Sequence, residues 1–220
     1  MERRFADRRE AGRVLARMLE GVSTDPDPVV LALPRGGVPV AREVAAHLGA
    51  PLEAFVVRKL GVPGHEELAL GAVASGGALV LNQDVVRSLD LSTDVIEAVA
   101  DRERQELARR EREYRGDRPM PDVTGRCVIL VDDGLATGAS MRAAVAAARR
   151  LEPARLIVAV PVGAPSTCDE LRREVDEVVC AITPSPFHAV GVWYDQFDQT
   201  TDDEVRALLA DAHLTDASNG

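Results

Sequence analysis

The chain has 220 residues, of which 46% are hydrophobic and 28% charged, a composition that suits one globular domain over residues 1–220. A formal net charge of −10 argues against nucleic acid as the main partner, because neutralising phosphates requires a basic surface. No segment reaches the roughly 20 apolar residues of a membrane-spanning helix, and the Arg-rich residues 1–21 lack the apolar core of a secretion signal. We therefore expect a cytoplasmic protein with neither a membrane nor a nucleic-acid partner.

The predicted elements alternate between helices and short apolar strands. Helical spacing over residues 6–20 ends at Gly21, and an apolar run at 29–33 passes through PRGG into a helix that begins near Pro39. Further strands are predicted at 52–57, 127–131, 156–162 and 178–182, with helices at 140–151, 166–174 and 202–214. Continuous apolar strands between helices are typical of a sheet buried on both faces, so we predict an α/β fold with an open, mainly parallel twisted sheet flanked by helices.

A long excursion, residues 58–125, separates the second predicted strand from the third. The stretch GAVASGGALVL predicts a hairpin with its turn at Ser75–Gly77, and a helix follows near 93–114. That helix is dense in charge, with opposite-sign pairs four residues apart at Glu106/Arg110 and Arg109/Glu113. Such pairing indicates a solvated face rather than a binding surface.

One motif stands out from ordinary turn chemistry. The stretch VILVDDGLATGAS, residues 128–140, runs from an apolar strand into Asp132 and Asp133 and then into small residues that begin a helix. Such a loop exposes backbone N–H groups to an anion at the helix N-terminus, and Thr137 and Ser140 add hydroxyl donors. The two carboxylates suit a ligand that donates hydrogen bonds or carries a metal ion. A sugar phosphate meets both demands.

Other phosphate-binding classes do not fit this string. A P-loop needs GxxxxGK[ST], but Lys59, the only lysine among 26 basic residues, follows Arg58 instead. A receiver domain would place its acid pair near the N-terminus and a lysine late in the fold. A dinucleotide fingerprint needs GxGxxG, whereas Gly134 and Gly138 are spaced GxxxG. The isolated lysine is either a specific requirement for a compact ammonium or a chance survivor.

Three stretches together resemble one family. VILVDDGLATGAS resembles the phosphoribosyl pyrophosphate signature of the type I phosphoribosyltransferases, LPRGGVPVA their pyrophosphate loop, and VRKLGVPGHEELALGAVA the flexible loop of adenine-type members. Residues 28–200 also resemble a bacterial subgroup labelled predicted phosphoribosyltransferase, whose members end in a stretch like TPSPFHAVGVWYDQF and bring no particular acceptor. The resemblance implies the fold predicted above, with a flexible loop and hairpin, a charged helical insertion and a C-terminal hood.

The resemblance also implies roles for individual residues. Asp132 and Asp133 would hold the ribose hydroxyls and stabilise an oxocarbenium-like transition state. The remaining groups would bind phosphates: Ala136, Thr137, Gly138, Ala139 and Ser140 the 5′-phosphate; Arg35, Gly36 and Gly37 the pyrophosphate; and Arg58 and Lys59 the charge of the leaving group. Mg²⁺ is the implied cofactor, held mainly by substrate oxygens rather than by a protein cage, with Asp132 or Asp133 as contacts through water.

The acceptor is less well defined. Ala136 stands where 6-oxopurine members carry an aspartate, so this loop supplies no acid or base, and Glu66 or Glu67 on the flexible loop is the candidate for proton transfer, with Glu67 preferred. The neighbouring His65 is equally consistent with an exposed loop residue. Four of the seven aromatic residues lie between 187 and 197, where they would form either a hood at 183–200 for a planar base or a small core that packs the final helix. Of these, Phe187 and Trp193 are the first candidates for the acceptor.

The sequence thus predicts a phosphoribosyltransferase that moves 5-phosphoribose from Mg²⁺-bound phosphoribosyl pyrophosphate to a nitrogen of an aromatic acceptor. Its partners would be these small molecules, and a homodimer is implied by the resemblance alone. Two alternatives remain open, since a fold does not fix a function. One is a regulatory protein that binds phosphoribosyl pyrophosphate or a nucleotide without turnover, and the other is a sugar-phosphate hydrolase or phosphorylase that uses the same site.

Overall fold

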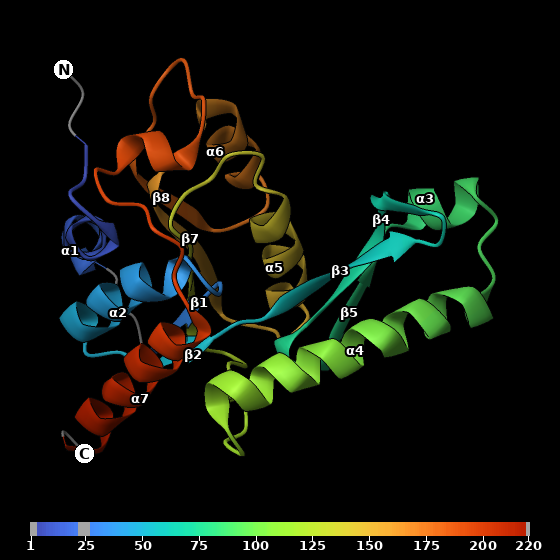
Figure 1. Ribbon diagram of the computed structural model, residues 1–220, viewed down its shortest axis with the longest axis horizontal. Coiled ribbons are helices and arrows are strands. Elements are labelled where there is room, and N and C mark those ends of the chain that lie inside the picture. Colours follow the sequence, from blue (N-terminus) through green and yellow to red (C-terminus); the bar gives the residue numbers. More distant parts are fainter. Residues whose placement is uncertain (1–3, 22–26, 219–220) are drawn as a thin grey trace.

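The computed structural model describes residues 4–21 and 27–218, and its centre is a five-stranded parallel sheet (Figure 1). Strand β1 (Pro28–Ala32) lies between β2 (Leu52–Ala54) and β6 (Cys127–Val131), and β7 (Arg155–Val162) and β8 (Glu177–Ile182) complete the order β2-β1-β6-β7-β8. All four neighbouring pairs are parallel. The predicted α/β class is confirmed. None of the helices in the described ranges has the length and apolar character that crossing a bilayer requires.

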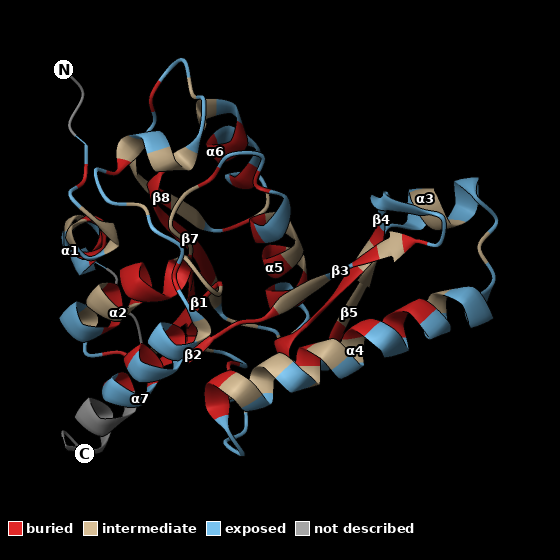
Figure 2. Ribbon diagram, viewed as in Figure 1, coloured by how far each residue is buried: buried red, intermediate tan, exposed pale blue. Residues whose placement is uncertain are grey.

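Helices cover both faces of this sheet, because alternate residues of each strand point to opposite sides. In β1, Val30 and Ala32 pack in one buried cluster and Val29 and Leu31 in another. Helices α1 (Arg8–Met18), α2 (Gly37–Leu48) and α7 (Asp202–Ser218) contribute to the first cluster, and α5 (Ala139–Arg149) and α6 (Pro165–Leu171) to the second. Buried residues accordingly concentrate along the central strands and the helix faces that meet them (Figure 2).

A second, antiparallel sheet projects from the first (Figure 1). It contains β3 (Val57–Val62), β4 (His65–Ala74) and β5 (Ala78–Leu81), and α3 (Gln83–Ser88) and α4 (Thr93–Arg115) pack beside it. The turn lies at Ser75–Gly77 as predicted, with φ of 79° at Gly76 and 77° at Gly77, a left-handed region that favours glycine.

The prediction of a single strand over 52–57 was wrong. β2 ends at Ala54, and Val57 begins β3 in the other sheet. Much of the stretch that resembles a flexible loop also forms strands rather than loop. Only Leu60, Val62 and Leu70 are buried between residues 57 and 70, so the continuous apolar run expected of a buried strand is missing there.

Helix α4 joins the two sheets. Its exposed side carries the predicted pairs, with Arg110 Nε 3.1 Å from Glu106 Oε1 and Arg109 Nη1 3.2 Å from Glu113 Oε2. Its other side is not solvated, because Arg115 at its C-terminus is buried and donates to the Ala54 carbonyl and the Ser75 hydroxyl, both at 3.1 Å. The helix therefore anchors the projecting sheet to the edge of the central one.

The strand order fixes where a ligand can bind. Numbered along the chain, the parallel strands run 2-1-3-4-5, so the connections that follow β1 and β6 leave the sheet in opposite directions. In open α/β sheets, ligands bind in the crevice outside the carboxyl ends of the strands at such a switch point. The PRGG loop and the acid pair Asp132–Asp133 both lie there.

Candidate active site

The loops after β1 and β6 approach each other closely enough to require glycine. A Cβ added at Gly36 would lie 2.7 Å from Asp133 Cγ, and one at Gly37 would lie 2.6 Å from the Val131 carbonyl oxygen and 2.9 Å from Asp132 Cα. Real Cβ atoms do not approach other atoms so closely. The structure therefore brings the predicted pyrophosphate loop into contact with the predicted ribose-binding acids.

The two acids have different surroundings. Asp132 Oδ1 accepts a 2.8 Å hydrogen bond from the Asp133 backbone N–H, and burial together with the charge of Asp133 raises the pKa of Asp132 well above its ordinary value. Burial also raises the pKa of Asp133, against the effect of Arg8, whose Nε donates to Asp133 Oδ2 at 2.8 Å. Partly desolvated neighbouring carboxylates of this kind are stabilised by a ligand that donates hydrogen bonds to them.

The loop from Asp133 to α5 is open to solvent and suited to an anion. Gly138, which precedes α5, has φ of 70° and no side chain with which to cap the helix. The Ala139 N–H lies 3.5 Å from Thr137 Oγ1, and the N–H groups of this first turn lie at the positive end of the helix dipole. Thr167 of α6 braces this loop, because its hydroxyl donates to the Ala136 carbonyl at 2.7 Å and its methyl group would lie 2.5 Å from a Cβ at Gly138. Ala136, Thr137, Ala139 and Ser140 are all exposed.

A cavity of about 140 Å³ connects these parts. Its lining includes Pro34 from the first loop, Asp132 and Ser140 from the second, and Arg58 from β3. Helix α4 adds Arg110 and Tyr114, which sequence reasoning did not assign to a site. Asp132, Ser140 and Arg58 thus meet in one cavity, which the predicted pyrophosphate loop reaches only through Pro34. Arg35 itself lines a different cavity, with Asp202 and Arg206.

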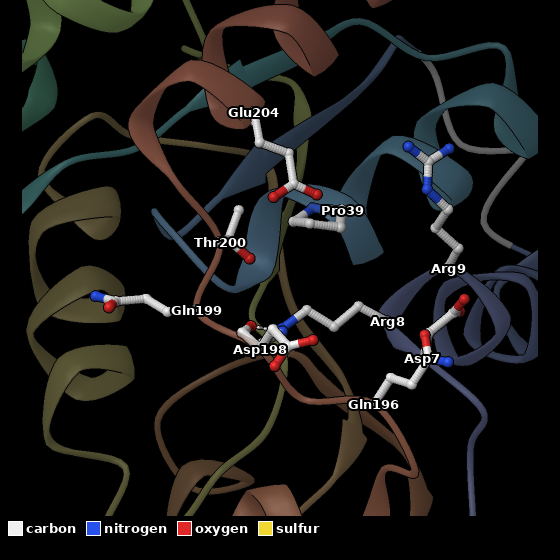
Figure 3. A pocket seen from close by; sticks show the side chains of 9 residues that line it. All are labelled: Asp7, Arg8, Arg9, Pro39, Gln196, Asp198, Gln199, Thr200 and Glu204. Atoms are coloured by element: carbon white, nitrogen blue, oxygen red, sulfur yellow. Dashed lines mark hydrogen bonds between the residues drawn. The ribbon is translucent and has the colours of Figure 1, made fainter.

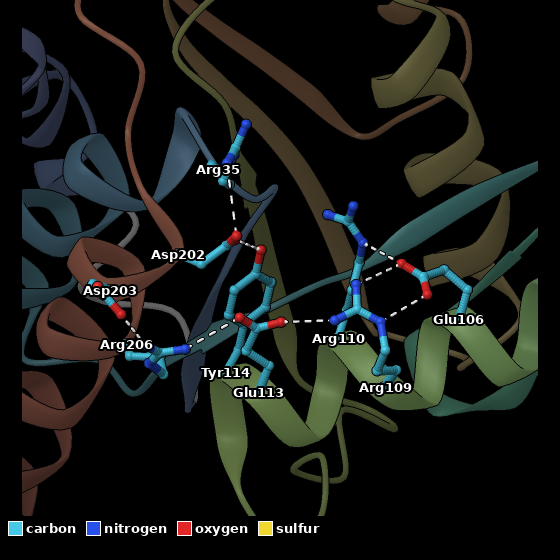
Figure 4. A network of polar contacts seen from close by, with 9 residues as sticks. All are labelled: Arg35, Glu106, Arg109, Arg110, Glu113, Tyr114, Asp202, Asp203 and Arg206. Carbon is cyan, nitrogen blue, oxygen red and sulfur yellow. Dashed lines mark hydrogen bonds and ion pairs between the residues drawn. The ribbon is translucent and has the colours of Figure 1, made fainter.

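Arg35 is held by a polar network between α7 and α4 (Figure 4). Its Nη1 lies 3.7 Å from Asp202 Oδ2, and the other oxygen of Asp202 accepts a 2.6 Å hydrogen bond from the Tyr114 hydroxyl. A separate ion pair joins the same two helices, with Arg206 of α7 lying 3.1 Å from Glu113 of α4. Residues of α4 and α7, which lie far from Arg35 in the sequence, therefore orient the arginine of the PRGG loop.

Tyrosine titration tests this network. Burial and the hydrogen bond to Asp202 raise the pKa of Tyr114 to about 12, and burial also raises the pKa of Tyr194, the second of the two tyrosines in the chain. The native protein is therefore expected to show almost no tyrosinate absorbance below about pH 11, whereas the unfolded chain titrates near the ordinary value of about 10. A native titration step near pH 10 would contradict this arrangement. In the Tyr114→Phe variant only Tyr194 can titrate, so this variant shows which tyrosine produces each step.

The chain is similar to proteins of one known family. Residues 63–196 match the phosphoribosyl transferase domain family. The chain belongs to this family. It is 48% identical over 216 residues to two Mycobacterium tuberculosis proteins, from strains CDC 1551 and H37Rv, that are provisionally named phosphoribosyl transferases. The match covers 98% of this chain but only 48% of either relative. The crystal structure of TT1426 from Thermus thermophilus is 46% identical, with a TM-score of 0.85 over 94% of this chain and 98% of that one.

The phosphoribosyl transferase fold does not bring all the predicted residues to one place. Arg58 and Lys59 are adjacent on β3, so their side chains point to opposite faces. Arg58 faces α4, where its Nη2 lies 2.8 Å from Glu103 Oε2, and lines the cavity with Asp132. Lys59 lines a different cavity, of about 550 Å³, together with Glu66, Glu67, Thr137 and Ala139. The predicted proton-transfer residue Glu67 thus lines the cavity of Lys59 and not that of Asp132, and the nearby His65 is exposed.

The aromatic residues near the C-terminus form a satellite cluster. Phe187, Trp193 and Phe197 are partly buried around Tyr194, whose ring centroid lies 4.9 Å from that of Phe197. The cluster packs on the N-terminal segment through Phe5, Ala11 and Val14 and on the end of β7 through Val162, so its partners are not those of a core beneath helix 202–214. The assignment of Phe187 and Trp193 to the acceptor remains a prediction.

The cluster is connected directly to the acid pair. The Tyr194 hydroxyl donates a 2.6 Å hydrogen bond to the backbone carbonyl of Asp133. Sequence reasoning identified the aromatic concentration but not this link, because residues 61 positions apart meet only in the folded chain. The aromatic cluster and the loop predicted to bind ribose are therefore joined by a hydrogen bond.

Proposed function

We propose that this chain transfers the 5-phosphoribosyl group of phosphoribosyl pyrophosphate to a nitrogen of an aromatic acceptor. The bond from the sugar C1 to pyrophosphate breaks, a C1–N bond forms, and the displaced N–H proton leaves the acceptor. The observation that carries the proposal is the cavity of about 140 Å³ in which Asp132, Ser140, Pro34 and Arg58 meet at the switch point of the sheet.

Each part of the site has a role in this reaction. Asp132 and Asp133 accept hydrogen bonds from the ribose hydroxyls, and their negative charge stabilises positive charge that develops on the sugar. The backbone N–H groups at the start of α5, with Thr137 and Ser140, bind the 5′-phosphate. Arg35 and the glycines beside it bind pyrophosphate, and Arg58 adds positive charge at the cavity that Asp132 and Ser140 line.

The acid pair also fits a contact with Mg²⁺. Asp132 and Asp133 offer hard oxygen ligands side by side, and residues 4–21 and 27–212 contain no group of three or more side chains that could form a metal site. The ion would therefore be held mainly by pyrophosphate oxygens, with one of these carboxylates reached through water. When bound, Mg²⁺ supplies positive charge that makes pyrophosphate a better leaving group.

Two groups of residues would serve the aromatic acceptor, one for stacking and one for proton transfer. A planar base would stack near Phe187 and Trp193, beside the residues that connect the hood to Asp133. Glu67 would serve in proton transfer only if the strands β3 and β4 moved toward the acid pair, because it lines the cavity of Lys59. A homodimer in the cytoplasm is part of the same proposal.

Calorimetric titration with phosphoribosyl pyrophosphate, with and without Mg²⁺, tests the proposal. Mg²⁺-dependent binding, followed by pyrophosphate release that needs an added aromatic base, is the expected result. Pyrophosphate release in the absence of any base would identify a hydrolase, and binding without release for any base would identify a regulatory protein. No binding under either condition would overturn the proposal altogether.

A further inference from the structure

Arg8 reaches the candidate active site from the N-terminal helix. Its Nε donates to Asp133 Oδ2 at 2.8 Å, although the two residues are 125 positions apart in the chain. Figure 3 shows the side chain extended from α1 toward Asp198, whose backbone carbonyl accepts a 2.7 Å hydrogen bond from Arg8 Nη1. One guanidinium thus joins α1, the acid pair and the hood.

This guanidinium is contacted both on one face and along its edge, which fixes its orientation. Its carbon lies 3.9 Å from the centroid of the Phe197 ring, so the ring covers one face while Nε and Nη1 bond along the edge. The Arg8 side chain is 12% exposed and that of Asp133 is 16% exposed. A planar donor fixed in this way holds its acceptor in one orientation, which a flexible ammonium does less well.

We propose that Arg8 is a positioning residue, which orients the Asp133 carboxylate for the ribose of the bound substrate and couples the hood to the acid pair. The inference rests on the function proposed above. A carboxylate has about four acceptor positions, so Asp133 can bond Arg8 and still accept from a hydroxyl group. Gly36 packs against the Asp133 carboxyl group and the Tyr194 hydroxyl bonds to the Asp133 backbone carbonyl, and Arg8 adds a charged donor to this residue.

A role in orientation follows from the crowding around Asp133. Asp132 is its neighbour, and two adjacent buried carboxylates repel each other, so an unrestrained Asp133 would turn toward solvent. Arg8 opposes this movement with a charge-assisted hydrogen bond. Partners that orient a functional side chain commonly change activity or affinity by about 10–100-fold when they are removed, and a shift of about 1 Å in such a group costs a similar factor.

The test uses the full chain and compares Arg8→Gln with Arg8→Lys and with the neighbouring control Arg9→Gln. Arg9 is exposed and lines the cavity of about 210 Å³ in Figure 3. Arg8→Gln is expected to weaken binding of phosphoribosyl pyrophosphate and to lower kcat/KM by about 10–100-fold. The KM for the acceptor should change much less, whereas a collapsed hood would raise both KM values. Arg8→Lys should recover part of the loss, and Arg9→Gln should behave as the native protein.

A double-mutant cycle separates positioning from a purely structural effect. If Arg8 acts through Asp133, adding Arg8→Gln to Asp133→Asn causes little further loss, because the oriented group is already altered. Strictly additive losses, or a fully active Arg8→Gln, would overturn the inference. If Arg8→Gln does not fold, the same cycle is measured with Arg8→Lys. Native-like binding of phosphoribosyl pyrophosphate by Arg8→Lys would then contradict the inference. Failure of the native protein to bind phosphoribosyl pyrophosphate would count against the proposed function first.

Discussion

Replacement of both Asp132 and Asp133 by asparagine is expected to weaken binding of phosphoribosyl pyrophosphate by roughly 10²–10⁴-fold and to abolish measurable transfer. Hydrogen bonds to charged groups contribute about 1.5–3 kcal/mol each, and every 1.4 kcal/mol corresponds to about a factor of ten in affinity. The asparagines keep the size of the side chains but remove the negative charge that faces the sugar. Isothermal titration calorimetry in the presence of Mg²⁺ measures the effect.

For Asp132 the loss should not come from unfolding, because this carboxylate is destabilising in the folded chain. Its raised pKa means that the folded state binds more protons than the unfolded state between the unfolded and folded pKa values. This group's contribution to stability is therefore most favourable below about pH 3.9 and declines as pH rises toward the folded pKa. At pH 7, Asp132→Asn removes the penalty and keeps an acceptor for the Asp133 N–H, so its Tm is expected to equal or exceed that of the native protein.

A double variant on the surface provides the control. Asp84→Asn/Asp101→Asn also removes two negative charges, and each of these exposed residues pairs only across one helical turn, with Arg87 at 2.9 Å and Arg104 at 2.8 Å. Unchanged binding in this control and lost binding in the Asp132/Asp133 variant would assign the effect to the site. Equal binding in all three proteins would show that the acid pair does not contact the ligand.

The sequence predicts the parts of this site that are local in the chain. The apolar strand Cys127–Val131, the two acids after it and the small residues before α5 are adjacent in sequence, so their relative placement follows from a strand-loop-helix unit. The PRGG loop is predictable for the same reason, and the strand order then brings the two loops together.

Residues that reach the site through tertiary packing are not predictable in this way. Arg8, Thr167 and Tyr194 bond to the loop after β6 from α1, α6 and the hood, and Tyr114 of α4 lines the same cavity as Asp132. Nothing in the sequence around Arg8, Tyr114 or Thr167 marks them as functional. The sequence also suggests that Arg58 and Lys59 act together, because they are adjacent in the chain. The pleat of β3 instead points their side chains to opposite faces. The aromatic concentration at 187–197 was a usable signal, although it could not indicate which side chain bonds to Asp133.

Gly36→Ala and Gly37→Ala are expected to have large effects of different kinds. A Cβ at Gly36 collides with the Asp133 carboxyl group, a side chain, whereas a Cβ at Gly37 collides with the backbone of Val131 and Asp132. A side chain can move at modest cost, but displacing it takes the carboxylate out of position. We therefore expect Gly36→Ala to fold with a loss of about 1–3 kcal/mol in stability and to lose about 100-fold in kcat/KM.

Gly37→Ala should instead fail through stability, because the end of β6 cannot shift without disturbing the centre of the sheet. A loss of about 3 kcal/mol or more lowers Tm by on the order of 10 °C in a chain of this size. Gly21→Ala is the matched control, since a Cβ there meets no atom within 4 Å. Thermal unfolding and calorimetry separate the outcomes. If Gly36→Ala bound phosphoribosyl pyrophosphate normally, Asp133 could not be fixed in contact with the pyrophosphate loop, and the geometry that supports the proposed transfer would be wrong.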